Sequence, residues 1–203
     1  MTSFTRQRAD LAAFWDERFE AQFMPWDQAG VPPDLLGFVA ANTAPLTTLI
    51  PGCGAAYELA LFAEKAWPVR AIDFSASAVA LAKKVSPLWA QHVEQADFFS
   101  YQAAQAIQLI YERAFFCALP PEKRPEIVAQ WMNLLAHGGL VAGFFFINDD
   151  AKAGKRGPPF SVSMAELCGL MEAHFDLLEH RAASDSIAVF QGNEHWMVWR
   201  KRA

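Results

Sequence analysis

The chain has 203 residues, of which 53% are apolar and 19% are charged, and its formal net charge is −5. This composition excludes intrinsic disorder, and the length suits one compact domain, since domains commonly run to about 100–200 residues. The acidic balance argues against nucleic-acid binding, which rests on Lys and Arg that neutralise phosphates. The basic runs at 152–156 and 200–202 are interpreted as a solvated loop and tail. Aromatic residues make up 13% of the chain, which indicates either a bulky core or an apolar pocket lined with rings.

Cysteine usage and the N-terminal composition bear on the compartment. The three cysteines are odd in number and far apart, which argues against a disulfide framework and favours a reducing compartment. No CxxC or HxxxH pair occurs, so no metal site is predicted. Arg6, Arg8 and Asp10 leave no apolar signal region, and no apolar run approaches the ~18–20 residues of a membrane span. We therefore expect a soluble cytoplasmic protein with no membrane partner.

The first part of the chain predicts a helix and then an irregular segment. Apolar residues recur on one helical face over residues 10–23. Pro and Gly residues between 25 and 33 then predict irregular chain, which contains Trp26 and Asp27.

Strands and helices alternate along the rest of the sequence. Ser75 is a good N-cap for a helix over 76–85, and Ser163 with Glu166 forms a capping box for a later helix. The alternation predicts βαβ units, hence a mostly parallel sheet between helices in an α/β fold. The remaining expected elements are strands at 47–50, 69–72, 92–95, 107–111, 140–147, 175–181 and 195–202, a helix at 55–66, and a helix from Pro125 to a stop at Gly138-Gly139.

The chemistry is expected where the strands end, because ligands of open parallel sheets bind beyond the carboxyl ends of the strands. Gly52 and Gly54 follow the first predicted strand and let the backbone approach a ligand closely. Asp73 ends the second strand 21 residues after Gly52, close to the ~20-residue spacing of an acid that binds ribose hydroxyls. At the end of the third strand, Asp97 could accept an adenine amino hydrogen and Phe98 could pack on the base.

Both NAD and S-adenosylmethionine satisfy this pattern. Tyr57 replaces the third glycine of GxGxxG, which eases passage of a pyrophosphate that adenosylmethionine lacks. A dehydrogenase of this length would also have little chain left for a substrate domain. The pattern favours adenosylmethionine, and a small NAD-binding reductase stays open as the alternative.

Several segments in one order carry a family resemblance. They are Phe14–Phe19, Pro25–Asp27, Pro51–Gly54, Ala71–Ser75, Ala96–Phe99, Tyr111–Leu119, Gly157–Phe160 and Glu194–Arg200. Together they resemble the thiopurine S-methyltransferase superfamily, which includes the halide and thiol methyltransferases. The resemblance implies a Rossmann-like class I methyltransferase fold, with seven strands ordered 3-2-1-4-5-7-6 and the last antiparallel. It also implies one domain over 1–203, in which residues 1–45 form an N-terminal helix and an aromatic loop that cover the cofactor site.

The resemblance further implies the cofactor, S-adenosyl-L-methionine, and the residues around it. Ala55, Ala56, Trp67 and Glu112 depart from the usual family residues, but none of them removes an expected cofactor contact. The implied cofactor-binding residues are Trp15, Phe19 and Trp26 as aromatic contacts, Gly52, Cys53 and Gly54 at the methionine portion, Asp73 at the ribose, Asp97 and Phe98 at the adenine, and Arg113 after the fourth strand.

Methyl transfer from a sulfonium is an in-line displacement, in which the enzyme places a nucleophile about 3–3.5 Å from the methyl carbon and excludes water. A thiol is partly ionised near neutral pH and a halide needs no base, so we assign no catalytic residue. The predicted substrate wall consists of Trp26, Phe115, Phe116 and Phe160. We expect a monomeric methyltransferase acting in detoxification on a small soft nucleophile: a thiol, a thiopurine, a halide or thiocyanate, or a selenium or tellurium species. A non-catalytic cofactor-binding protein on the same scaffold is the other alternative.

Overall fold

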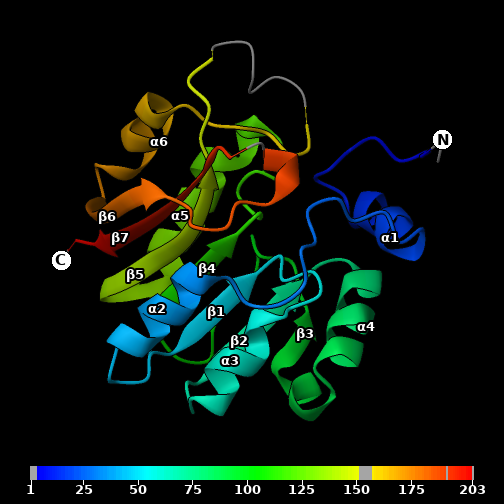
Figure 1. Ribbon diagram of the computed structural model, residues 1–203, viewed down its shortest axis with the longest axis horizontal. Coiled ribbons are helices and arrows are strands. Elements are labelled where there is room, and N and C mark those ends of the chain that lie inside the picture. Colours follow the sequence, from blue (N-terminus) through cyan, green and yellow to red (C-terminus); the bar gives the residue numbers. More distant parts are fainter. Residues whose placement is uncertain (1–3, 151–156, 191, 203) are drawn as a thin grey trace.

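The computed structural model describes residues 4–150, 157–190 and 192–202, so the basic run at 152–156 lies outside the described residues. Its centre is a seven-stranded sheet of order β3-β2-β1-β4-β5-β7-β6 (Figure 1). The last strand, β7, is antiparallel to both β5 and β6, and the other neighbouring pairs are parallel. This confirms the predicted fold class and strand order. The strands are β1 (Thr48–Pro51), β2 (Val69–Asp73), β3 (Val93–Gln95), β4 (Ile107–Arg113), β5 (Leu135–Phe146), β6 (Phe175–Ala182) and β7 (Glu194–Lys201).

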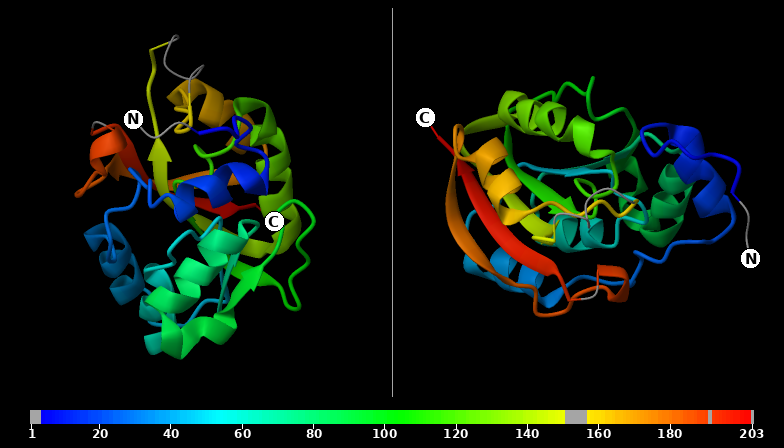
Figure 2. Two further views of the ribbon diagram at one scale, coloured as in Figure 1. Left: turned by 90° about the vertical axis from the view of Figure 1, so that its right-hand side faces the viewer. Right: turned by 90° about the horizontal axis from the view of Figure 1, so that it is seen from above.

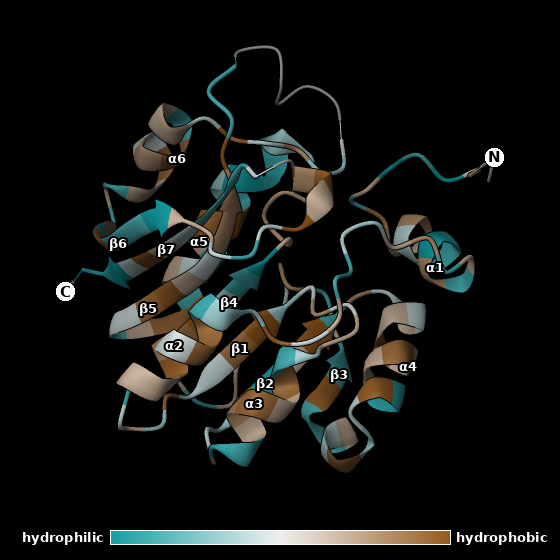
Figure 3. Ribbon diagram, in the orientation of Figure 1, coloured by the Kyte–Doolittle hydropathy of each residue, from teal (hydrophilic) through white to brown (hydrophobic). Residues whose placement is uncertain are grey.

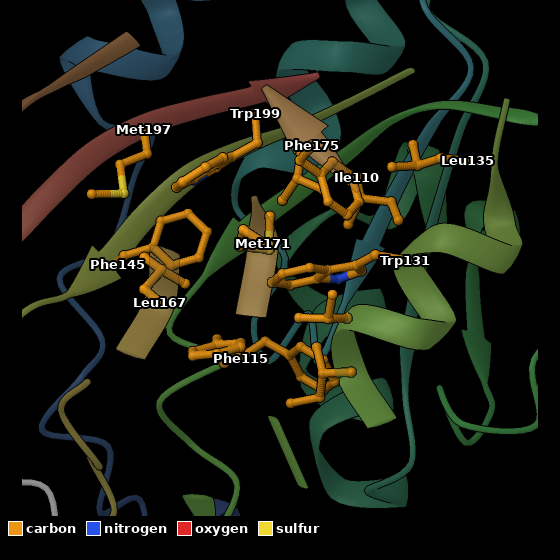
Figure 4. Close-up of a cluster of buried hydrophobic side chains, with 14 of the residues drawn as sticks. Ile110, Phe115, Trp131, Leu135, Phe145, Leu167, Met171, Phe175, Met197 and Trp199 are labelled. Carbon is orange, nitrogen blue, oxygen red and sulfur yellow. The ribbon is translucent and has the colours of Figure 1, made fainter. Parts of the chain in front are cut away.

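Helices cover both faces of the sheet (Figure 2). The six α-helices are α1 (Ala12–Glu20), α2 (Pro33–Ala41), α3 (Glu58–Glu64), α4 (Ala76–Val85), α5 (Arg124–Leu134) and α6 (Met164–Met171). Helices α5 and α6 pack on one face, where Trp131 and Met171 lie beside Phe145 and Trp199 of the sheet (Figure 4). Helices α2, α3 and α4 cover the other face. Hydrophobic residues concentrate on the central strands, whereas the edge strand β6 is largely hydrophilic (Figure 3).

The two predicted N-caps are confirmed. Ser75 Oγ accepts a hydrogen bond from the Ala78 amide at 3.1 Å, and Ser163 Oγ accepts one from the Glu166 amide at 3.1 Å. The Glu166 carboxylate itself pairs with Arg124 at 2.7 Å, which ties α6 to α5. A side-chain oxygen at the N-cap satisfies an amide that the first helical turn leaves without a partner.

Several predicted boundaries were wrong, and one helix, α2, was not predicted at all. Helix α3 begins at Glu58 rather than residue 55, because Ala56 adopts a left-handed conformation with φ of +51°. Gly138-Gly139 does not stop a helix: α5 ends at Leu134, and the two glycines lie inside β5, where its register with β4 shifts. Such a bulge accommodates extra residues in one strand. Helix α1 covers residues 12–20 only, and α2 begins at Pro33 within the segment read as irregular.

Candidate functional site

A cavity of about 410 Å³ opens at the carboxyl ends of β1, β2 and β4. The loop between β1 and α3 forms its floor, and the ends of β2 and β4 flank that loop. Helix α1 and the loop 25–30 cover it, and residues 157–159 and 187–190 complete the wall. Open α/β sheets bind their ligands at this edge, so the cavity is the candidate site.

The floor depends on glycine. Gly52 and Gly54 have left-handed φ values of +54° and +51°, which side chains rarely adopt. A Cβ on Gly52 would lie 2.4 Å from Cδ2 of Phe115, so the ring packs directly under the backbone there. Both glycines and the intervening Cys53 line the cavity, as the resemblance implies.

Asp73 lies at the end of β2 and is only 6% exposed. Its Oδ2 accepts a hydrogen bond from the Gly54 amide at 3.0 Å, and its Oδ1 accepts one from the Ser75 amide at 2.9 Å. Burial raises the pKa of this carboxyl to about 6, although the two amide bonds oppose the shift. A carboxylate oxygen has a second lone pair, so Asp73 can still accept hydrogen bonds from ligand hydroxyls.

Asp97 and Phe98 follow β3 and line the cavity beside Asp73. Asp97 is exposed, and its Oδ1 accepts the Phe99 amide at 3.1 Å. The buried Phe98 ring lies edge-on to Phe115, with 4.9 Å between the ring centroids. This end of the cavity thus combines an accessible carboxylate with an aromatic wall.

Three aromatic rings from the N-terminal part of the chain also line the cavity. Trp26 meets both Trp15 and Phe19 edge to face, at centroid distances of 5.3 and 6.0 Å. The Trp15 indole donates to the Ala9 carbonyl at 2.8 Å, which fixes its orientation. All three rings line the cavity, so a cationic ligand group there would meet aromatic surfaces.

Helix α1 is held against α4 by a carboxylate that sequence reasoning passed over. Asp16 accepts hydrogen bonds from Ser75 Oγ at 2.6 Å and from the Ser77 amide at 3.1 Å. Asp16 therefore stabilises the N-terminus of α4, where the helix dipole favours negative charge. Its place in the Phe14–Phe19 motif was the one available signal.

Arg113 is the last residue of β4, lines the cavity and forms an ion pair with Glu58. Its Nη1 lies 3.5 Å from Glu58 Oε1, which also accepts a hydrogen bond from the Tyr111 hydroxyl at 3.2 Å. Burial raises the pKa of Glu58, and the charge of Arg113 opposes that shift. The guanidinium also lies 5.0 Å from the centre of the Phe144 ring.

Asp27 and Tyr57 form a further pair in the cavity wall. The Tyr57 hydroxyl donates to Asp27 Oδ2 at 3.1 Å, and the Ala29 amide donates to Oδ1 at 2.8 Å. Sequence reasoning treated Tyr57 only as the residue in place of a glycine and gave Asp27 no role. The motif Pro25–Asp27 was the signal that pointed to it.

The predicted substrate wall needs correction at two of its four positions. Trp26 and Phe115 line the cavity, but Phe116 does not: it is 2% exposed and stacks on Trp131 at 5.6 Å in the core. Ala114, with φ of +60°, turns the chain after β4 and separates the directions of the two rings. Phe160 also lies outside the cavity, where it packs on the cluster of Phe14 and Trp15. The wall residues that the sequence did not reveal are Pro158, Pro159, Ile187, Val189 and Phe190.

Two cysteines contribute to the lining. Burial raises the pKa of the Cys53 thiol well above its ordinary value, and the charges of Asp73 and Glu58 add to the shift. Burial has the same effect on Cys117, with Glu112 and Glu194 adding to it. Both thiols are therefore protonated at neutral pH and act as apolar wall groups.

The described part of the chain holds neither a metal-ligand cluster nor a helix that could span a membrane. Within residues 4–150, 157–190 and 192–202, no group of three or more His, Cys, Asp and Glu side chains could hold a metal ion. Over the same residues, every helix is too short or too polar to cross a bilayer.

Known proteins resemble this chain over most of its length. The profile of the thiopurine S-methyltransferase family matches residues 11–202. The chain is 32% identical to probable thiol methyltransferase 2 of Arabidopsis thaliana, over 75% of this chain and 68% of that protein. It is 28% identical to thiocyanate methyltransferase 1 of the same plant, over 92% of this chain and 84% of that protein.

One solved structure shows the fold over the whole chain. The 1,6-didemethyltoxoflavin-N1-methyltransferase of Burkholderia thailandensis, solved with S-adenosylhomocysteine, has a TM-score of 0.75 at 17% identity. The alignment covers 100% of this chain and 94% of that one.

The cavity fits adenosylmethionine on its own geometry. Gly52 and Gly54 bring bare backbone to the cavity floor, the buried Asp73 has lone pairs that can accept hydroxyl hydrogens, and the rings of Trp15, Phe19 and Trp26 line the cavity, where ring faces can stabilise a cation. Both Arabidopsis relatives are named as methyltransferases and neither as an NAD enzyme, so they give the reductase alternative no support. The chain belongs to the thiopurine S-methyltransferase family and is an S-adenosylmethionine-dependent methyltransferase of small nucleophiles.

Proposed function

We propose that the cavity holds adenosylmethionine through residues from both the sheet and the N-terminal cover. Asp73 binds the ribose hydroxyls, and Asp97 and Phe98 bind the adenine. Carboxylates accept hydroxyl and amino hydrogens, and a ring packs on the base. The backbone of Gly52, Cys53 and Gly54 and the guanidinium of Arg113 bind the methionine portion. The rings of Trp15, Phe19 and Trp26 surround the sulfonium, whose charge ring faces stabilise.

We further propose that the acceptor is a small soft nucleophile: a thiol, a thiopurine, thiocyanate, a halide, or a selenium or tellurium species in detoxification. The observation that carries this proposal is the apolar character of the cavity beyond the cofactor residues, where Phe115, Ile187 and Val189 form the wall. Soft nucleophiles lose less hydration in such a chamber than hard oxygen nucleophiles do. The names of the two Arabidopsis relatives, a thiol and a thiocyanate methyltransferase, support the same class.

In this proposal the protein positions the acceptor and excludes water from the cavity. The bound cofactor supplies a methyl group that is activated by the sulfonium. The rings of α1 and the loop 25–30 exclude water and keep the acceptor within reach of that methyl group. Phe115 is held by Phe98 on one side and by the backbone of Gly52 on the other, so the floor under the acceptor is rigid.

We also propose a cytoplasmic monomer of one domain, in which residues 1–45 cover the cofactor site and no nucleic acid or membrane is bound. The free state of Cys53, Cys117 and Cys168 supports a reducing compartment. The net charge of −5 supports the absence of a nucleic-acid partner.

Calorimetry and a turnover panel test the proposal. Adenosylmethionine and S-adenosylhomocysteine should bind saturably, and Asp73→Asn should weaken both. Asp176→Asn, a change to an exposed carboxylate on β6, should leave binding unaltered. Turnover is then measured with iodide, thiocyanate, hydrosulfide, aromatic thiols, selenite and tellurite. Failure to bind either cofactor form, or binding without product from any acceptor, contradicts the proposed function.

A further inference from the structure

The charges around the cavity are unbalanced toward carboxylates. Among the residues that the structure describes, the charged side chains that line it are Asp27, Glu58, Asp73, Asp97, Arg18 and Arg113, four carboxylates against two guanidiniums. Glu58 lies beside Arg113, and Arg18 is held between the Phe4 and Phe14 rings and bonded to the Phe14 carbonyl. The cavity thus favours a cationic cofactor and disfavours a second negative charge beside it.

Cys53 shows how the cavity affects the ionisation of a thiol. Its thiol lies in the cavity wall, and burial with the charges of Asp73 and Glu58 raises its pKa well above the ordinary value. An acceptor thiol that enters the same cavity meets the same burial and the same carboxylates. Burial disfavours the charged thiolate, and the neutral thiol is a poor nucleophile until it loses its proton.

Asp27 is the cavity carboxylate placed to take that proton. Asp73 is almost fully buried and is assigned to the ribose hydroxyls in the proposed function, and the Glu58 carboxylate lies 3.5 Å from Arg113. Asp97 is exposed to solvent, so a proton acceptor there would not lie in a water-poor part of the cavity. Asp27 instead follows Trp26 in the cover, half-buried, with its carboxylate oriented by the Tyr57 hydroxyl.

We propose that Asp27 is the proton acceptor for thiol acceptors and that Tyr57 orients it. The S–H bond of the thiol breaks, and its proton passes to a carboxylate oxygen of Asp27. The freed sulfur pair forms the bond to the methyl carbon, while the pair of the breaking methyl–sulfonium bond stays on the departing sulfur. Asp27 afterwards returns the proton to solvent. This inference rests on the proposed function, since it requires that thiols are among the acceptors.

Halides provide an internal reference, because iodide carries no proton. We compare kcat/KM for an alkyl thiol and for iodide in the wild type and in Asp27→Asn. A general base contributes about 10²–10⁴-fold, so the thiol-to-iodide ratio should fall by roughly 100-fold or more in the variant. Tyr57→Phe leaves the carboxylate and removes its orienting donor, so the ratio should fall less, on the order of tenfold. Asp97→Asn is the matched control, and it should lower both activities together.

The pH profile supplies a second readout. An alkyl thiol has a pKa of about 8.5. If the wild type uses the neutral thiol, its kcat/KM should decline above that pH, because less of the thiol is then neutral. In Asp27→Asn only the thiolate reacts, so kcat/KM should rise with pH through the same range. Both proteins share the other titratable and charged side chains that line the cavity in the described residues, which are Arg18, Cys53, Tyr57, Glu58, Asp73, Asp97, Tyr111, Arg113 and Cys117.

Binding measurements separate the proton acceptor from a cofactor anchor. Calorimetry with S-adenosylhomocysteine should give Kd values within about threefold for the wild type and Asp27→Asn. A large loss of binding, or an equal fall in thiol and iodide turnover, would show that Asp27 holds the cofactor or the fold, and it overturns the inference. An unchanged ratio overturns it as well. Absence of turnover with every acceptor in the wild type would instead refute the proposed function itself, and this inference with it.

Discussion

Gly52→Ala tests how tightly the cavity floor is built. Gly52 has φ of +54°, and a Cβ there would lie 2.4 Å from Cδ2 of Phe115. The left-handed conformation costs an L residue about 1–2 kcal/mol. Phe115 is 8% exposed and lies against Phe98, so it has little room to withdraw, and overpacking a core costs about 1–3 kcal/mol more. The substitution should therefore destabilise the protein by about 2–5 kcal/mol.

Urea unfolding followed by circular dichroism measures that loss as a lower midpoint with an unchanged slope. Two glycines serve as controls. Gly54→Ala carries the same φ strain, but its Cβ would lie 3.7 Å from Phe19, so it should cost only about 1–2 kcal/mol. Gly169→Ala, in α6 with no atom within 4 Å of the added Cβ, should stabilise the protein by about 0.5–1 kcal/mol.

The ordering of the three substitutions decides the argument. Equal costs for Gly52→Ala and Gly54→Ala would show that Phe115 moves aside freely and that the floor is not rigid. In the double variant Gly52→Ala with Phe115→Leu, the clash part of the cost should be recovered, as a coupling of about 1–3 kcal/mol. Additive effects would contradict the contact between these two residues.

Three further predictions concern the carboxylates of Asp73, Glu112 and Asp16. Asp73→Asn should weaken S-adenosylhomocysteine binding about tenfold or more in calorimetry and lower stability, because an amide nitrogen cannot accept the bond from Gly54 or Ser75. Burial raises the pKa of Glu112 from its ordinary 4.5 to about 8, so the folded state keeps a proton that the unfolded state loses. Stability should therefore fall as pH rises from about 4.5 to 8, and Glu112→Gln should reduce that fall in urea unfolding at pH 5 and 8.5. Asp16→Asn removes the charge at the N-terminus of α4 and should cost about 0.5–2 kcal/mol, with faster amide exchange in α1.

A specific result would contradict each of these three predictions. Unchanged binding in Asp73→Asn would place the ribose elsewhere. A pH dependence of stability that is the same in Glu112→Gln and the wild type would mean that other groups cause it. If the amides of α1 exchange at the same rates in Asp16→Asn and in the wild type, apolar contacts alone hold this helix.

Features that depend on a few neighbouring residues could be predicted from the sequence. The strand ending at Pro51 and its glycine loop follow from local composition, and the position of Asp73 follows from the spacing of two strands. Since parallel strands end at one edge, the two had to meet, and the hydrogen bond from the Gly54 amide to Asp73 shows that they do. The strand order came from the family resemblance, because alternation alone does not order the strands of a sheet.

Features that depend on single backbone angles or on distant loops could not be predicted. Phe115 and Phe116 are adjacent, and only the φ of +60° at Ala114 sends one ring to the cavity and the other to the core. Asp27 and Tyr57 are 30 residues apart, and their contact depends on how the loop 25–30 crosses the cavity. Sequence periodicity carries no information on either.

The cavity has two halves that differ in how they are tied to the core. Phe115, at the floor, belongs to the large core cluster, so substitutions there change stability together with the shape of the cavity. Ile187 and Phe190, in the connection between β6 and β7, pack with Cys117 in a small separate cluster. The connection between β6 and β7 is held at Ile187, whose amide donates a hydrogen bond to the Glu194 carboxylate of β7 at 2.5 Å. Substitution of Val189, which is half-buried and lines the cavity, can therefore reshape this part of the wall while the floor at Gly52 and Phe115 stays in place.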